Sequence, residues 1–333
     1  MEKRLDISVV VPLYNEEESL PELTAWIDRV ARENGLSYEI VFVDDGSTDG
    51  ESGAICDRYA ASHPNQVRAL HQPNGGAGAA RNRGIELAQG DYLLFVDGDD
   101  WLAPNLLEDL SASIAATPAD LYLFGALVER DGKVTGELHE ELPADLPTHT
   151  KDAPQLFFGV MAPWNRAYRR TLFTEGGIRF ATKVWYEDIR IVTKVLALAE
   201  QVVRLPGAYY HYLQREGSAM NNKNCARNVE ILYAFDDILG WFGEHGLREA
   251  YRDELTFLAI SHLLIAASVR VARIDCKSEL LGQFRDYMEK NFPDFRENRY
   301  LPRLDRNKRL VYRLLLKRRY RVVRLLFRIK DGR

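Results

Sequence analysis

The first hundred residues predict an α/β fold, with a mostly parallel sheet and helices on both of its faces. Short apolar runs alternate with stretches of helical periodicity, and polar clusters follow the apolar runs. β–α units in series favour a parallel sheet that is buried on both faces. Open sheets of this kind bind ligands at the carboxyl ends of their strands, so the polar clusters mark the candidate site. The expected strands are Ile7–Val11, Tyr38–Val43, Val67–His71 and Tyr92–Val96.

Composition excludes several classes of protein. The 333 residues, 46% of them apolar and 28% charged, indicate one large or two ordinary globular domains and not a disordered chain. Cys56, Cys225 and Cys276 are too few and too far apart for a disulfide framework or a paired-cysteine metal site, which favours a reducing cytosol. Apolar runs stay short of the ~18 residues that span a membrane, so we expect no spanning helix.

Charge is distributed unevenly along the chain. Residues 296–333 contain 15 Lys and Arg but 3 Asp and Glu, a net charge of +12 in a chain of net charge −5. The first 295 residues therefore carry −17. Such an acidic body would repel phosphate backbones, which argues against a nucleic-acid-binding protein. The basic segment is better interpreted as a feature at the periphery of the protein.

After Pro104 the pattern is less regular. From about Cys225 it becomes mostly helical, which predicts two domains, residues 1–220 and a helical region 221–333. The second ends in a basic amphipathic tail, residues 303–331, which we expect to be a helix. The other expected elements are strands at Leu121–Val128, Val202–Leu205 and Ala208–Gln214, and helices near Ala153–Met161 and Ile189–Ala199.

Asp97-Gly98-Asp99 follows the fourth expected strand and indicates a metal site. Two carboxylates one residue apart can reach the same divalent cation, and oxygen ligands select Mg²⁺ or Mn²⁺, which would neutralise a diphosphate. The alternative is a solvated acidic turn before the next helix. The position after an apolar strand, within a series of β–α units, favours the metal.

Polar clusters also follow the second and third strands. Asp44 and Asp45 can accept hydrogen bonds from an imide N–H, as in uracil, or from ribose hydroxyls; the neighbouring Ser47-Thr48-Asp49 is also suited to helix capping. Segment 74–84 superficially fits a dinucleotide-binding fingerprint, but its sixth position is Arg81 and it follows the third strand. We therefore expect its glycines to let the backbone approach a nucleotide, with Arg81 near the base or phosphates; the alternative is a helix-surface arginine.

Two further clusters lie later in the chain. Glu187 and Asp188 lie at the start of an expected helix. A carboxylate at this position can act as a general base toward a sugar hydroxyl, or the two acidic residues can simply stabilise the helix N-terminus. His211, Arg215 and Ser218 are candidates for contact with a diphosphate leaving group, although a lone histidine is more often structural. The histidines are dispersed and no HExxH motif is present, which argues against a zinc enzyme.

In order and spacing, these segments resemble the family 2 inverting glycosyltransferases, which have the GT-A fold, the Rossmann-like fold of nucleotide-diphospho-sugar transferases. The resemblance is strong over about the first 110 residues, and residues 163–218 resemble the family's bacterial polysaccharide branch. The matching segments are Val9–Glu16 (VVVPLYNE), Val43–Asp49 (VDDGSTD), Asn74–Gly84 (NGGAGAARNRG) and Phe95–Trp101 (FVDGDDW).

The resemblance implies a role for each matching residue. Asp45 would meet the uracil imide, Asp97 would bind ribose or water on the metal, and Asp99 would bind the metal itself. Asp188 is a better candidate for the catalytic base than Glu187. The residues implied around the donor nucleotide are Pro12, Tyr14, Glu16, Asp44, Asp45, Arg81 and Asp97.

The expected function is therefore an inverting, metal-dependent glycosyltransferase that moves a sugar from a nucleotide-diphospho-sugar, with UDP-sugar favoured, to a glycan or lipid-linked glycan in cell-surface polysaccharide synthesis. The absence of a Gln-x-x-Arg-Trp motif, which marks processive synthases, implies one sugar per encounter. One alternative is a nucleotidyltransferase, although the acidic loop after Pro12 counts against it. The other is a catalytically inactive sugar-binding or scaffold protein.

The tail has two open interpretations. Residues 303–331 contain no Gly or Pro, and Leu310, Leu314, Tyr320 and Leu325 are interleaved with many cations. Such a helix either packs on the acidic body or lies on an anionic membrane surface. The interleaving favours the membrane, so we expect a cytoplasmic enzyme with a peripheral position on the inner face of the cell membrane.

Overall fold

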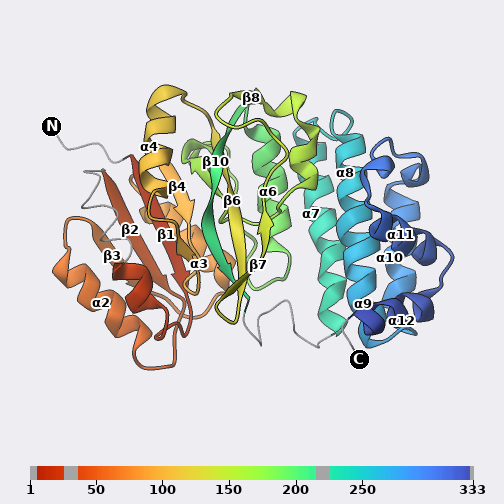
Figure 1. The fold of residues 1–333 in the computed structure, drawn as a ribbon, viewed down its shortest axis with the longest axis horizontal. Helices are drawn as coiled ribbons and strands as arrows, with labels where there is room; N and C mark the ends of the chain where they lie inside the picture. Colours follow the sequence, from red (N-terminus) through yellow and green to blue (C-terminus); the bar gives the residue numbers. More distant parts are fainter. Residues whose placement is uncertain (1–5, 26–36, 215–224, 331–333) are drawn as a thin grey trace. The chain divides into compact units, whose positions relative to one another are not determined.

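The computed structural model describes residues 6–25, 37–214 and 225–330. Its contacts divide the chain into two units, Met1–Arg215 and Glu216–Arg333, which are treated separately below (Figure 1). The expected boundary between residues 220 and 221 falls outside the described residues and stays a prediction.

The first unit is built on a mixed sheet with a parallel core. Its strand order is β3–β2–β1–β4–β9–β6–β10–β5, with β7 beside β6 and β8 beside β10. The pairs β3–β2, β2–β1, β1–β4 and β6–β10 are parallel, whereas β9 runs antiparallel to both of its neighbours. The bounds are β1 Ile7–Leu13, β2 Tyr38–Asp44, β3 Val67–His71, β4 Tyr92–Phe95, β5 Trp101–Leu102, β6 Leu121–Arg130, β7 Lys133–Leu138, β8 Thr148–His149, β9 Arg166–Arg169 and β10 Gln201–Leu213.

The position of β1 determines where the site lies. β1 pairs in parallel with β2 on one side and β4 on the other, so the strand order reverses there. A crevice outside the carboxyl ends of the strands forms at such a point. Leu13 of β1 pairs with Asp44 of β2, and Val10 with Phe95 of β4. The polar clusters after these strands therefore meet at one edge, as the sequence predicted.

Helices cover both faces of this sheet (Figure 1). Their bounds are α2 Ser52–Ser62, α3 Ala77–Leu87, α4 Leu106–Ala116, α5 Thr171–Thr174 and α6 Glu187–Leu198. Val9 and Val11 of β1 share one buried cluster with Ile55 of α2 and Leu110 of α4. Val10 points to the opposite face, where it lies against α3. The four N-terminal strands and the cover on both faces are confirmed.

Two elements of this unit differ from the expectation. β10 is one strand where two were expected; Pro206 and Gly207 lie within it, and its register with β6 shifts around Ala208, as at a β-bulge. The helix expected near Ala153–Met161 is instead two 3₁₀ turns, Thr150–Asp152 and Pro154–Phe158. The proline at position 154 disfavours helical geometry in the residue before it, which separates the two turns.

The second unit is helical, as expected. One helical stretch, Arg252–Ile274, is long enough to cross a membrane and contains an 18-residue window of mean hydropathy 1.8, although the short apolar runs predicted no such helix. However, 72% of that window is buried, as in the core helix of a globular domain. The main elements are α7 Glu230–Glu244, α8 Arg252–Ala259, the π-helical η5 Ile260–Ala267, α9 Ser268–Ile274, α10 Leu280–Asn291, α11 Arg306–Leu316 and α12 Tyr320–Lys330.

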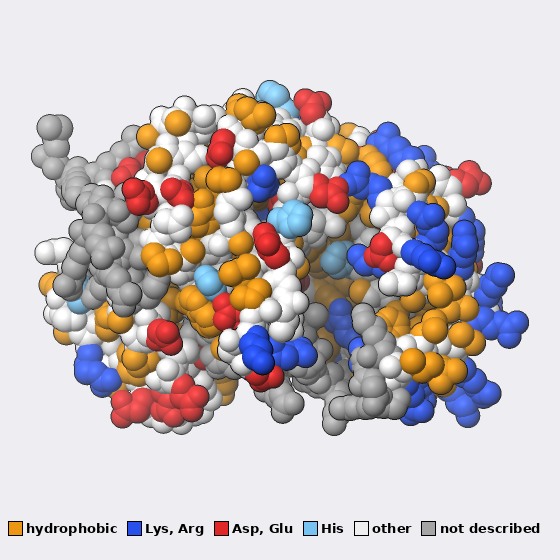
Figure 2. Space-filling model, in the orientation of Figure 1, with side chains coloured by type: hydrophobic (Ala, Val, Ile, Leu, Met, Phe, Trp, Pro, Cys, Tyr) orange, Lys and Arg blue, Asp and Glu red, His pale blue; other side chains and the backbone are white. Residues whose placement is uncertain are grey.

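The basic tail forms two helices and not one. α11 ends before Lys317, and Arg318 has a left-handed backbone with φ of 53°. The break lets α11 contact η5 while α12 contacts α9. Lys and Arg side chains gather over these last helices (Figure 2).

Candidate active site

Arg81 joins two acidic clusters that are far apart in the sequence. Its guanidinium lies 2.7 Å from Asp97 Oδ1 and 3.3 Å from Glu187 Oε1. The Arg81 side chain is 5% exposed, against 28% for Asp97 and 22% for Glu187. Burial alone would lower the pKa of Arg81, but Asp97 and Glu187 raise it, so the guanidinium stays charged. The alternative of a helix-surface arginine is therefore wrong.

The segment before α6 is fastened to α3. Asn82 donates from its side chain to the Phe180 carbonyl and accepts from the Phe180 N–H, both at 2.9 Å. A Cβ on Gly78 would lie 2.2 Å from the carbonyl oxygen of Ala181, so only glycine permits this approach. The Arg81 guanidinium also lies over the Phe180 ring, 5.4 Å from its centroid. Gly78 therefore serves a protein contact, and the approach of a nucleotide to this segment stays a prediction.

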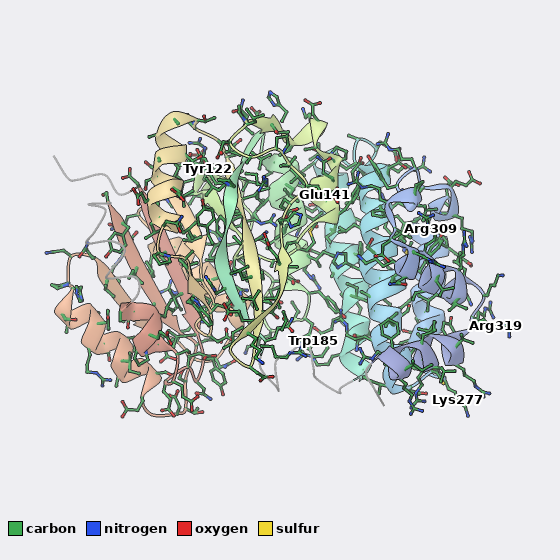
Figure 3. The ribbon with its side chains drawn as sticks, in the orientation of Figure 1. Tyr122, Glu141, Trp185, Lys277, Arg309 and Arg319 are labelled. Atoms are coloured by element: carbon green, nitrogen blue, oxygen red, sulfur yellow. The ribbon has the colours of Figure 1, made fainter. Side chains whose placement is uncertain are left out.

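Asp188 lies beside this bridge at the start of α6. It is partly buried, and its Oδ1 accepts a 2.7 Å hydrogen bond from the Ile189 N–H. Burial and the neighbouring Glu187 charge raise the pKa of Asp188 to about 7, while Arg81 opposes that rise. Tyr186, just before the pair, has a left-handed backbone (φ 65°), a costly conformation for a bulky residue that clusters at functional sites. Trp185, labelled in Figure 3, lies in the same segment.

A third acidic residue, Asp100, supports the loop that contains Asp97 and Asp99. Tyr210 of β10 donates to Asp100 Oδ2 at 2.7 Å, and the Leu213 N–H donates to Oδ1 at 2.8 Å. The Asp97 N–H in turn donates to the Tyr210 oxygen at 3.1 Å. Burial and the negative charges of Asp97 and Asp99 raise the pKa of Asp100 to about 9. The Asp97 and Asp99 carboxylates therefore place negative charge at this strand end, which the Arg81 guanidinium beside Asp97 partly offsets.

The same loop offers the type of donor atom that a divalent cation takes. Asp97 and Asp99 are partly exposed oxygen donors within this concentration of negative charge. Among the described residues, no group of three or more His, Cys, Asp or Glu forms a metal cluster. Mg²⁺ is commonly held by one or two carboxylates together with substrate phosphates, so two donors suit this kind of site.

Asp44 and Asp45 hold the loops after β2 and β3. Asp44 accepts a hydrogen bond from the Ser47 N–H at 2.9 Å, and its Oδ2 lies 2.8 Å from His71 Nδ1. Burial alone would raise the pKa of Asp44, but these contacts lower it. Asp45 accepts from the N–H groups of Gly75 (2.9 Å) and Gly76 (2.7 Å). Both aspartates are buried. The uracil contact of Asp45 stays a prediction.

The residues expected around the nucleoside follow the same edge. Pro12 is buried within β1, Tyr14 is 46% exposed just beyond it, and Glu16 is partly buried. Asn15, which the sequence analysis passed over, has φ of 58° and accepts from the Thr48 N–H at 2.7 Å. It fixes the loop after β1 to the loop after β2.

The third group of candidates is described only in part. His211 Nδ1 lies 2.6 Å from Glu129 Oε1, and its ring stacks on Trp101 at 5.3 Å. Its neighbour Tyr210 reaches Asp100, and adjacent strand residues point to opposite faces. These contacts fit the structural interpretation of the histidine, and the diphosphate contact stays a prediction. Arg215 and Ser218 lie outside the described residues.

Sequence reasoning missed the partners that hold the acidic residues in place. Asn15, Asn82 and Tyr210 all lie within motifs or aromatic runs that the sequence displays, but nothing in the sequence pairs them with Thr48, Phe180 or Asp100. Those pairings depend on tertiary contacts between loops.

Fold and strand-end chemistry together define the class of protein. The crystal structure of S. aureus TarS 1–349 in complex with UDP-GlcNAc aligns with a TM-score of 0.57 at 21% identity, covering 88% of this chain and 91% of that one. The mannosyltransferase PcManGT from Pyrobaculum calidifontis, in complex with GDP-Man and Mn²⁺, aligns with a TM-score of 0.54 at 18% identity, covering 97% and 88%. These likenesses confirm the GT-A fold.

The sequence matches the family model described as glycosyl transferase family 2 over residues 8–177, and the chain belongs to that family. The glycosyltransferase GlyG of Streptococcus pneumoniae is 34% identical over 229 residues, which cover 65% of this chain and 73% of GlyG. The protein is accordingly a glycosyltransferase, and the nucleotidyltransferase and inactive-scaffold alternatives are set aside. The matched region includes Arg81, Asp97 and Asp99 and ends before Glu187.

Proposed function

We propose that the enzyme transfers one sugar per encounter from a UDP-sugar to a hydroxyl of a glycan or lipid-linked glycan, with inversion and with Mg²⁺ or Mn²⁺. The observation that carries this proposal is the Arg81 bridge. One buried guanidinium joins Asp97, on the nucleotide side of the site, to Glu187, beside the candidate base. The similarity to a structure that contains UDP-GlcNAc supports the class of donor.

The nucleotide-sugar donor is proposed to bind at the carboxyl ends of the strands. The exposed Tyr14 ring offers a surface against a base, and the neighbouring carboxylates offer acceptors for imide or ribose groups. Arg81 Nε is buried and has no hydrogen-bond partner within the described part of the chain. A buried donor without a partner is costly, so a ligand oxygen that accepts from Arg81 would be stabilising. This supports the proposed position of Arg81 near the nucleotide.

Asp188 is the proposed base. Glu187 is paired with the Arg81 guanidinium, so one of its oxygens is already engaged. Asp188, with a pKa of about 7, ionises near neutral pH and can then accept the acceptor hydroxyl's proton. The hydroxyl oxygen attacks the anomeric carbon as the bond to the diphosphate breaks. A single displacement from the opposite face inverts the configuration.

Asp97 and Asp99 are the proposed metal ligands. Bound there, Mg²⁺ or Mn²⁺ would neutralise charge on the departing nucleoside diphosphate. Asp100 and Tyr210 would keep the loop in place, because the hydrogen bonds to Asp100 fix the backbone that follows the ligands. The acceptor class, the cell-surface polysaccharide and the cytoplasmic location belong to the same proposal.

A donor screen tests this function. Nucleotide sugars are compared by thermal shift with Mn²⁺, with Mg²⁺ and with chelator, and a donor that stabilises the protein is then used in a hydrolysis or transfer assay. We expect a UDP-sugar that stabilises the protein in the presence of metal, and a rate that rises as pH increases through about 7. NMR of the product's anomeric proton reports the configuration. Retained configuration, or undiminished transfer in chelator, would overturn the corresponding part of the proposal.

A further inference from the structure

α12 presents an apolar stripe on its outer side. Val322, Leu325, Leu326 and Ile329 are exposed to 42, 56, 36 and 69%. Their spacing of three, four and seven residues aligns them along one side of a helix. Large aliphatic side chains in a continuous exposed row differ from the scattered apolar residues of an ordinary surface.

The opposite side of α12 is held by its own unit. Val323 is fully buried, and the Phe327 ring lies 5.5 Å from the Arg273 guanidinium of α9. The helix therefore has two apolar sides, one packed on α9 and one facing outward. Packing within this unit accounts for the first side and leaves the outer stripe unexplained.

Cations surround this stripe. Between Arg306 and Lys330 the sequence has 11 Lys and Arg and no Asp or Glu. Figure 2 shows hydrophobic atoms bordered by Lys and Arg over α11 and α12, and Arg319, labelled in Figure 3, extends away from the unit. On α11, Leu310 is 48% exposed among the same charges. The exposed cations are Arg306, Lys308, Arg309, Arg313, Lys317, Arg318, Arg319, Arg321 and Arg328.

We propose that the outer side of α11 and α12 is a docking surface for an anionic lipid bilayer, with the α12 stripe inserted among the acyl chains and the cations at the headgroups. Anionic lipid complements two helices whose sequence contains no acidic residue, and a bilayer accepts aliphatic side chains. A second copy of the chain would bring two strongly positive surfaces together. Nucleic acid would satisfy the cations but would leave the aliphatic stripe in water.

The two components predict separable effects on binding. Each cation near an anionic surface strengthens binding by about fivefold, so the loss of three weakens it by about 100-fold. Each aliphatic side chain that inserts contributes about tenfold or more. The cationic part weakens with salt, since the screening length is about 10 Å at 0.1 M, whereas the inserted part persists.

Vesicle sedimentation of the full chain tests the surface without using catalysis, so its result is independent of the proposed transfer reaction. Vesicles of phosphatidylglycerol and phosphatidylcholine are compared with vesicles of phosphatidylcholine alone. One variant replaces Val322, Leu325, Leu326 and Ile329 with Gln, which preserves helix propensity. Its control replaces exposed apolar residues elsewhere, Val134→Gln, Leu146→Gln and Tyr233→Gln.

A second variant and its control test the contribution of the cations. Arg313→Gln, Arg321→Gln and Arg328→Gln remove three exposed cations from the surface, whereas Arg58→Gln, Lys133→Gln and Arg248→Gln remove three exposed cations from elsewhere. We expect the native chain and both controls to sediment with anionic vesicles and both surface variants to bind at least 100-fold more weakly. Circular dichroism should show unchanged melting, because the substituted side chains are exposed.

Three results would overturn the proposal. The first is a native chain that stays in the supernatant with anionic vesicles at low salt. The second is an apolar-stripe variant that binds vesicles as tightly as its control, since nothing would then be inserted. The third is a dimer, detected by analytical ultracentrifugation, that the stripe variant abolishes, which would assign the surface to a second copy of the chain.

Discussion

Arg81→Gln should both destabilise the first unit and displace the pH dependence of transfer. The native guanidinium is 5% exposed and lies 2.7 Å from Asp97 and 3.3 Å from Glu187. Removing one member of a buried charge group leaves the others uncompensated, at a cost of about 3–5 kcal/mol. Because Asp97 and Glu187 are partly exposed, water relieves some of that cost, and we expect about 3 kcal/mol.

The second effect concerns Asp188, the proposed base. Arg81 lowers the pKa of Asp188, which burial and Glu187 raise to about 7. Without Arg81, that pKa rises further, so a larger fraction of Asp188 is protonated at neutral pH. The acidic limb of the rate profile should therefore move to higher pH, and raising the pH should recover part of the lost rate.

Denaturant unfolding and a pH–rate profile measure these two effects. Arg83→Gln is the matched control, because Arg83 lies on the same helix in an exposed pair with Glu86, and its free energy of unfolding should change by less than about 0.5 kcal/mol. Arg81→Lys keeps the charge but replaces a two-armed guanidinium with a single ammonium. A loss of less than 1 kcal/mol in Arg81→Gln, or an unmoved acidic limb, would refute the coupling inferred from this bridge.

Three further substitutions test separate parts of the site. Asp188→Asn should leave donor affinity intact and lower kcat by about 10²–10⁴, the typical contribution of a general base; near-normal turnover would move the base to Glu187 or elsewhere. Asp99→Ala should abolish the Mn²⁺-dependent part of UDP affinity in calorimetry, and unchanged affinity would argue against the metal ligand. Gly84→Ala would place a Cβ 2.1 Å from Val10 Cγ1 and should cost about 1–3 kcal/mol in unfolding, whereas Gly282→Ala, with open space around it, should be neutral or stabilising.

The sequence predicted what depends on local pattern. Apolar runs near Ile7, Tyr38, Val67 and Tyr92 formed the parallel strands, since alternating β–α segments leave few other arrangements. Once those strands are parallel, their polar ends must share one edge, so the candidate site followed from topology. The tail was harder, because its helical periodicity continues through Lys317–Arg319 and only the contacts of α11 and α12 with the rest of their unit require a break.

Contacts between loops could not be predicted in this way. Asp45 was expected at a ligand, and the structure adds a second role, because Asp45 accepts hydrogen bonds from the N–H groups of Gly75 and Gly76. A carboxylate at a strand end suits either partner, and residue type does not distinguish them. Arg81 posed the same problem, because the local sequence does not distinguish an arginine on the helix surface from one buried between two carboxylates.

The residue spacing in helix α3 explains why the Arg81 bridge depends on several residues of the segment Asn74–Gly84. Gly78, Arg81 and Asn82 are spaced by three and four residues, so they share one side of the helix, and all three contact the segment 180–188. Gly84 lies against β1 and sets the distance between helix and strand. A one-residue insertion before Arg81 would rotate that side by about 100° relative to the rest of the helix and carry the guanidinium away from both carboxylates. The glycines and Asn82 therefore position Arg81, and Arg81 joins Asp97, on the proposed nucleotide side of the site, to Glu187 beside the proposed base.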